Sequence, residues 1–182
     1  MLALDEARNR LILGDVLDAL REGRFPILLT ERRDHLDHLA ACLRESVPHL
    51  IVLQGGMSAK ERKAAADQLD AIPVGETCLV LATGRYIGEG FDNARLDTLF
   101  LAMPISWKGT LVQYSGRLHR LHAGKHEVRI YDYVDSKVGA LARMFEKRMK
   151  AYRAIGYSHV DDHRESEPEF DPATERSDDA EE

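Results

Sequence analysis

Apolar residues recur along the chain in two alternating patterns, one typical of helices and one typical of buried strands. A helix is predicted from about Asp5, because apolar residues follow it at helical spacing until Gly23. Pro26 then opens the short apolar run Ile27 to Leu29, which predicts a strand. The chain therefore begins with a helix followed by a strand.

The same alternation continues through most of the chain. Ser58 and Glu61 have the spacing of a capping box and predict the start of one helix. Other helices are predicted over residues 34–45, from about Lys108, and in a last stretch with an apolar stripe that runs from Val138 to Tyr152. Further strands are predicted at residues 50–53, 78–82, 99–102 and 128–133.

Strands that are almost wholly apolar, with helices between them, indicate a parallel sheet that is covered on both faces. The predicted fold class is therefore α/β, with a mainly parallel sheet between two layers of helices. In such sheets ligands bind beyond the carboxyl ends of the strands. The chemistry is expected in the segments that follow Leu29, Leu53, Ala82 and Ala102.

The charge of −6 is distributed unevenly and divides the chain. Residues 161–182 hold 11 Asp and Glu against 2 Arg, which leaves 23 Lys and Arg against 20 Asp and Glu in residues 1–160. So acidic a segment cannot bury enough apolar surface to fold and is expected to be a disordered tail. The predicted organisation is an N-terminal helix (residues 1–23), a domain (residues 24–160) and the tail (residues 161–182).

Several classes of protein and site are excluded or disfavoured. No apolar run is long enough to span a membrane and no secretory signal is present, so a cytoplasmic protein with no membrane partner is expected. Cys42 and Cys78 lie far apart and are expected to be buried free thiols. The histidines lack the cysteine or carboxylate pattern of a metal site, and His35 and His38 are expected on an exposed helix face. The last helix is basic, either as a solvated face or as a contact for a nucleic-acid backbone; its cations are Lys137, Arg143, Lys147, Arg148 and Lys150.

The segment from Gln113 to Arg120 holds the most informative candidate residues. In a helix Gln113, Gly116, Arg117 and Arg120 share one face, while the apolar residues of the segment form another; these are Leu111, Tyr114, Leu118 and Leu121. Two guanidinium groups on one rigid face suit phosphate oxygens. A solvated polar face, with the arginines paired to carboxylates, is the alternative.

Two glycine-containing segments are expected at the same edge of the sheet. Thr83 and Gly84 end a strand and offer a hydroxyl and an unshielded amide, and Gly88 and Gly90 predict a tight turn that delivers Asp92. After another strand, Gln54-Gly55-Gly56 forms a possible anion nest ahead of the capped helix. Plain turns are the alternative in both cases.

Taken in order along the chain, these segments resemble motifs IV, V and VI of superfamily 2 helicases, in the branch with type III restriction and DEAD/DEAH-type ATPases. The likeness covers about Arg24 to Tyr133, and the pattern Gln113-x-x-Gly116-Arg117-x-x-Arg120 is its most specific part. The resemblance implies the second, C-terminal RecA-like domain of such a protein. The matching segments are Leu28-Leu29-Thr30, Gln54-Gly55-Gly56-Met57, Ala82-Thr83-Gly84, Glu89-Gly90-Phe91-Asp92 and the motif VI pattern.

The resemblance also implies a role for each candidate residue. Arg117 and Arg120 would be catalytic arginine fingers that reach the γ-phosphate of ATP. The implied nucleotide contacts are Gln113, Gly116, Gly88, Gly90 and Asp92. The implied contacts with a nucleic-acid backbone are Thr30, Gly55, Gly56, Thr83 and Gly84.

The sequence lacks the parts that would bind the nucleotide itself. Gly124-Lys125 is followed by His126, not by the Ser or Thr of a Walker A loop, and Asp5-Glu6 fits the first turn of a helix better than a metal-binding carboxylate pair. We therefore expect ATP and Mg²⁺ to be held by an upstream RecA-like domain, with single-stranded DNA or RNA as the track. The chain alone is expected to bind no cofactor and to hydrolyse nothing. The rival hypothesis is a non-enzymatic nucleic-acid- or protein-binding module on the same scaffold.

Overall fold

The computed structural model describes residues 2–84, 86, 93–104, 114–122, 124–135 and 138–160. Every strand predicted from the sequence is present, with ends that differ by at most one residue from the prediction. Residues 114–118 are also helical, whereas the predicted acidic tail, residues 161–182, lies outside the described residues. The elements are η1 (Leu2–Leu4), α1 (Glu6–Arg21), β1 (Pro26–Thr30), α2 (Arg33–Leu43), β2 (His49–Leu53), α3 (Ala59–Asp70), β3 (Cys78–Thr83), β4 (Thr98–Leu101), β5 (Arg129–Asp132) and α6 (Gly139–Ala154).

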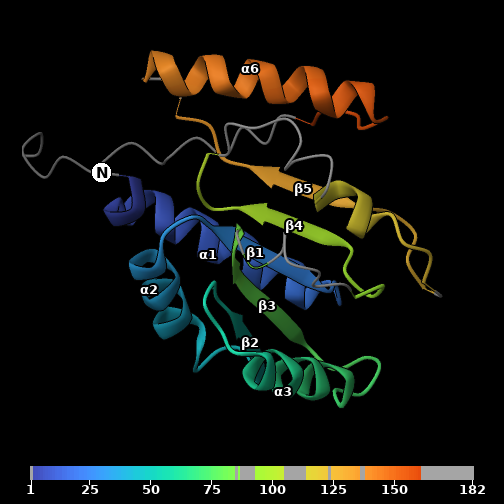
Figure 1. Cartoon of the computed structure of the whole chain (residues 1–182). Helices are drawn as coiled ribbons and strands as arrows, with labels where there is room; N and C mark the ends of the chain where they lie inside the picture. The colour runs from blue at the N-terminus through green and yellow to red at the C-terminus, as the bar shows by residue number, and fades with distance from the viewer. Residues whose placement is uncertain are drawn as a thin grey trace, which may run out of the picture.

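The five strands form one parallel sheet in the order β2-β3-β1-β4-β5 (Figure 1). Successive residues of a strand point to opposite faces. Leu28 of β1 packs with α1 and α2, while its neighbours Ile27 and Leu29 pack with α3 and α6. The two hydrophobic cores, one on each face of the sheet, confirm the predicted three-layer α/β fold.

The helix starts follow the local sequence. Asp5 caps α1 through its side chain, which accepts a hydrogen bond from the amide of Arg8 at 3.0 Å. This confirms that Asp5-Glu6 is the first turn of a helix. Ser58 and Glu61 form the predicted capping box at the start of α3.

The N-terminal helix, separated as residues 1–23 in the predicted organisation, packs into the same core as the rest. Ile12 and Val16 are fully buried in the cluster that contains Phe100. Arg8 is also buried, and its guanidinium bonds Asp135 at 2.9 Å and the carbonyl of Ala102 at 3.2 Å. Thus α1 is tied to the ends of β4 and β5.

Four sequence predictions about exposure are wrong. His35 is buried rather than exposed, and Cys42 is exposed rather than buried, although Cys78 is buried as expected. Leu121 is 98% exposed because the helix that was to carry it on its apolar face ends at residue 118. Arg148, counted with the cations of a basic face, is 5% exposed and bonds Asp132.

Candidate functional site

The carboxyl edge of the sheet brings together the predicted contacts for a nucleic-acid backbone. Thr30 and Thr83 end neighbouring strands and are paired in register. The amide of Gly55, which follows the next strand, donates a hydrogen bond to the hydroxyl of Thr83 at 3.0 Å. Three segments far apart in the sequence therefore meet at one edge, as expected for parallel strands.

The segment after β2 is a tight turn. The amide of Met57 donates to the carbonyl of Gln54 at 3.4 Å, which closes the turn. Gly56 has a φ of 91°, a conformation that favours glycine. Because the amide of Gly55 already bonds Thr83, this amide would have to change partner to join an anion nest. The geometry supports the plain turn that the sequence left open, with Gly56 exposed at its tip.

Thr30 is only 1% exposed, and its hydroxyl is engaged within the fold. The hydroxyl lies 3.0 Å from Nδ1 of His35, and Nε2 of His35 lies 2.9 Å from Oδ1 of Asn9. Since an amide oxygen can only accept, the His35 ring donates from Nε2 and accepts from Thr30 at Nδ1. A direct contact between Thr30 and a phosphate would require the hydroxyl to leave this arrangement.

Lowering the pH below 6.5 is expected to destabilise the domain through His35. Burial is the largest of the effects that lower the pKa of His35 from 6.5 to about 4. Between these values the unfolded chain takes up a proton that the folded chain does not, so the free energy of unfolding falls as the pH falls. The full shift corresponds to roughly 3 kcal/mol. The charged neighbours of His35 are Arg8 on α1 and Arg32, Asp34 and His38 at α2.

Urea unfolding at several pH values tests this expectation. The variant His35→Gln replaces the imidazole with an amide, which can hydrogen bond but does not titrate. The stability of this variant should therefore depend less on pH between 6.5 and 4. His38→Gln, on the same helix but exposed, should behave as the parent chain. Equal pH slopes for the parent and His35→Gln would refute the assignment.

Gly84 lies in a crowded position at the end of β3. A Cβ atom there would collide with the carboxylate of Glu31 and lie 2.8 Å from the hydroxyl oxygen of Tyr114. That hydroxyl donates to the carbonyl of Gly84 at 2.9 Å. Burial, together with the nearby Glu31, raises the pKa of Tyr114 to about 12, so the phenol keeps the proton that it donates.

Residues 114–120, the arginine segment, carry both predicted arginine fingers. Tyr114 and Leu118 are buried against the sheet at 4% and 1% exposure, which confirms these two residues of the predicted docking face, whereas Leu121 is exposed and Leu111 lies outside the described residues. Gly116 and Arg120 are exposed, and Arg117 is half-buried. The face that carries the arginines is therefore turned away from the core.

Four predicted nucleotide contacts lie outside the described residues, namely Gln113, Gly88, Gly90 and Asp92. Their roles stay predictions. Gly116 is described, and in the described part of the chain no atom outside its chain neighbours and its own helix backbone lies within 4 Å of the position that a Cβ would take there. A bulky group can therefore approach the backbone at Gly116.

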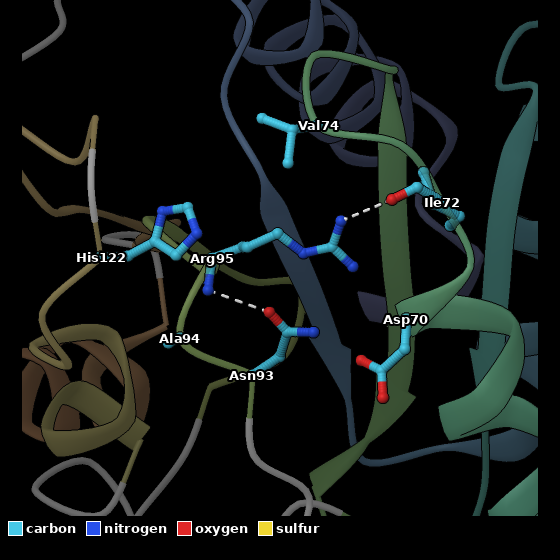
Figure 2. A pocket seen from close by; sticks show the side chains of 7 residues that line it. All are labelled: Asp70, Ile72, Val74, Asn93, Ala94, Arg95 and His122. Carbon is cyan, nitrogen blue, oxygen red and sulfur yellow. Dashed lines mark hydrogen bonds between the residues drawn. The ribbon is translucent and has the colours of Figure 1, made fainter.

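A pocket of about 400 Å³ lies at the opposite, amino edge of the sheet (Figure 2). Arg95 crosses it and donates to the carbonyl of Ile72 at 3.0 Å and to that of Leu69, both at the end of α3. The guanidinium also lies 4.7 Å from the centre of the Phe25 ring. Arg95 therefore caps α3, and this pocket is separate from the edge where the sequence predicts ligands.

Sequence reasoning missed two residues that shape the candidate site. Glu31 follows β1 directly, and its position after a strand end was the available signal. Lys125 stands out in the sequence only as part of an incomplete Walker A pattern, yet its ammonium bonds the carbonyls of Leu118 and Arg120 in the arginine segment. No sequence signal identified that contact.

The described part of the chain contains neither a metal cluster nor a membrane-spanning helix. No three His, Cys, Asp or Glu side chains in it gather closely enough to hold a metal ion. Nor is any of its helices long and apolar enough to cross a membrane.

No protein-family model matches the chain. One curated relative is the transcript termination protein A18 of Fowlpox virus (strain NVSL), which is 22% identical over 139 residues. The matched region covers 75% of this chain but only 29% of the relative, so the chain spans less than a third of that protein's length.

Several solved structures have a similar fold. T4 UvsW superposes with a TM-score of 0.64 at 15% identity, over 84% of this chain and 33% of UvsW. The C-terminal part of the Fun30 ATPase domain gives 0.56 at 17% identity, over 71% of this chain and 43% of the other. The E. coli DEAD-box protein SrmB, in its complex with regulator of ribonuclease activity A, gives 0.54 at 23% identity, over 68% and 70%. At the level of the fold, these comparisons confirm the predicted likeness to a RecA-like domain of the kind found in an ATPase and in a DEAD-box protein.

Proposed function

We propose that this chain is the second motor domain of an ATP-dependent nucleic-acid helicase or translocase. In this proposal Arg117 and Arg120 are arginine fingers for ATP that is held by a separate first RecA-like domain. The carboxyl edge of the sheet contacts the phosphate backbone of a single-stranded DNA or RNA track. The fold shared with a DEAD-box protein and an ATPase domain supports the proposal.

The observation that carries the proposal is the hydrogen bond from the Tyr114 hydroxyl to the carbonyl of Gly84. It joins the arginine segment directly to the strand end that bears the predicted backbone contacts. A ligand at the carboxyl edge and a nucleotide at the arginines would thus bind to two segments that are joined by a hydrogen bond. This arrangement suits a domain in which the track and the nucleotide influence each other.

The described residues of the arginine segment fit a nucleotide phosphate. Guanidinium groups stay charged at any relevant pH and match phosphate oxygens. The space beside Gly116 is open, so the phosphate chain can come close to the backbone. ATP, when bound with Mg²⁺ by the first domain, supplies the phosphoryl group that is transferred to water. Arg117 and Arg120 would stabilise the charge on the phosphoryl oxygens, and Gln113, Gly88, Gly90 and Asp92 would complete the nucleotide contacts.

The track contacts proposed at the sheet edge are mainly Gly55, Gly56, Thr83 and Gly84. Backbone amides and a hydroxyl hold phosphate without reading the base sequence. Glu31 lies beside Gly84 and would repel a phosphate there, but its side chain is exposed and can swing away. Thr30 would not contact the phosphate. Its hydroxyl would hold the His35 ring in place, and His35 lies at the start of α2.

The isolated chain is expected to show no ATP hydrolysis and only weak, salt-sensitive binding to single strands. Binding to backbone phosphates releases counterions, so the affinity should fall steeply between 50 and 200 mM salt, by roughly 10-fold or more. Fluorescence anisotropy with labelled single-stranded DNA and RNA checks the affinity, and a phosphate-release assay checks the hydrolysis.

The decisive experiment compares the full-length protein with a form that lacks this domain. Nucleic-acid-stimulated ATP hydrolysis should require the domain. Full turnover without it would overturn the proposal. Tight binding of single strands by the isolated chain, insensitive to salt, together with no effect of the domain on ATP turnover, would instead favour a non-enzymatic binding module.

A further inference from the structure

The ammonium group of Lys125 makes three hydrogen bonds to backbone carbonyls. Nζ lies 2.7 Å from the carbonyl oxygen of Ala94 and 2.9 Å from those of Leu118 and Arg120. An ammonium group has three donors, so all of them are used. Lys125 is half-buried, and burial lowers the pKa of its ammonium group. This side chain is therefore directed into the protein rather than toward solvent.

A turn aims Lys125 at these carbonyls. The amide of Lys125 donates to the carbonyl of His122 at 3.1 Å, and Gly124 within the turn has a φ of 89°. Such a φ favours glycine. The Gly124-Lys125 pair, which looks like part of a phosphate-binding loop in the sequence, thus serves to turn the chain back toward the arginine segment.

The helix that carries Arg117 ends at residue 118, inside the arginine segment. Its last carbonyl groups have no partner within the helix. Lys125 satisfies the carbonyl of Leu118 and adds a positive charge at the end of the helix where it is favourable.

Contacts with other described parts of the chain help to fix the arginine segment. Tyr114 bonds Gly84 at the start of the described helix. At its end the His119 ring meets the Tyr157 ring edge to face, with centroids 5.4 Å apart. Lys125 is the contact that holds the backbone on both sides of His119, at Leu118 and at Arg120.

We propose that Lys125 is a positioning residue for Arg117 and Arg120, an inference that rests on the proposed function. Through Ala94 the same ammonium group also ties the arginine segment to the residues that follow Asp92. Loss of the ammonium removes the contacts at the carbonyls of Leu118 and Arg120 and lets both guanidinium groups move from their working position. A displacement of about 1 Å is enough to reduce the rate of a catalysed step by up to roughly 100-fold.

The test compares Lys125→Met with Arg95→Met in the full-length protein. Both substitutions remove a half-buried cation that donates to carbonyls at the end of a helix, at the same edge of the sheet. Arg95, however, donates to the carbonyls of Leu69 and Ile72 at the end of α3, and Figure 2 draws the bond to Ile72. Thermal unfolding shows whether the two variants lose similar stability, and steady-state kinetics separates kcat from KM for ATP.

Lys125→Met is expected to reduce kcat roughly 10- to 100-fold. Arg95→Met, compared at a temperature where both variants are folded, should keep kcat within about 2-fold of the parent. Lys125→Arg, which keeps a charge and several donors, should recover part of kcat. In the isolated chain, amide hydrogen exchange over residues 114–120 should become faster in Lys125→Met and not in Arg95→Met.

Two results would overturn the positioning role of Lys125 alone, and a third would overturn the proposed function as well. An unchanged kcat in Lys125→Met, or equal losses in both variants, removes the positioning role while the proposed function stands. Unchanged turnover in Arg117→Ala and Arg120→Ala instead removes the proposed function, and the role of Lys125 with it. If Lys125→Met does not fold, Lys125→Arg and the exchange pattern decide, because a purely structural role predicts full kcat in every folded variant.

Discussion

Replacing Arg117 or Arg120 with alanine is expected to reduce nucleic-acid-stimulated ATP turnover of the full-length protein about 10³-fold. Charge develops on the phosphoryl oxygens as the bond to the leaving group breaks, and a prepositioned guanidinium stabilises it. The loss should appear mainly in kcat, because the contact strengthens as the reaction proceeds. Arg117→Lys and Arg120→Lys keep a charge but lose the planar pair of donors and should recover little.

Arg44→Ala is the matched control for the two finger variants. Arg44 is exposed and lies just after α2, at the amino edge of the sheet and far from the Tyr114–Gly84 contact. Its removal should leave turnover within about 2-fold, as is usual for surface substitutions with no specific partner. All three variants should unfold at the temperature of the parent. A full rate in either finger variant would exclude that arginine from catalysis.

Replacing Asp132 with alanine is expected to cause a large loss of stability. Its carboxylate accepts hydrogen bonds from Nε of Arg148 at 2.6 Å and Nη2 at 2.9 Å, and from the Tyr152 hydroxyl at 2.9 Å. The side chains of Arg148 and Asp132 are only 5% and 7% exposed. Removing Asp132 leaves a buried guanidinium without its carboxylate, which costs about 3–5 kcal/mol. α6 should detach from the sheet first.

Denaturant unfolding measures the effect of Asp132→Ala, and Glu22→Gln provides the comparison. Glu22 also pairs with an arginine, Arg129 at 2.6 Å, but its side chain is 51% exposed. An exposed ion pair contributes little to the free energy of unfolding, so Glu22→Gln should shift the midpoint far less. A loss below about 1 kcal/mol in Asp132→Ala would show that the buried pair does not hold α6 in place.

The layered fold could be predicted because its causes are local. Runs such as Cys78 to Ala82 are apolar at every position, and only a strand covered on both faces tolerates that pattern. The start of α3 could be predicted because Ser58 and Glu61 satisfy each other within one turn. The strand order β2-β3-β1-β4-β5 could not be predicted. It depends on how the connections between strands cross over the sheet, and no short sequence pattern determines that.

The candidate site could be predicted as far as its residues follow strand ends or helical spacing. Thr83 and Gly55 meet because neighbouring parallel strands share an edge. His35 was misplaced because its polar neighbours in the sequence suggested an exposed face, whereas its partners Asn9 and Thr30 come from other elements. Lys125 was missed for a related reason. Its partners are backbone carbonyls, which leave no trace in the identity of the residues that bear them.

The two thiols of the chain differ in a way that makes domain movement measurable. Cys78 is buried and burial raises the pKa of its thiol to about 11, so it reacts slowly with electrophiles. Cys42 is exposed on α2 and belongs to neither the arginine segment nor the carboxyl edge. A maleimide dye can therefore be attached to this domain without any engineered cysteine. With a second fluorophore on the proposed first domain, energy transfer would test whether the two domains approach each other during turnover.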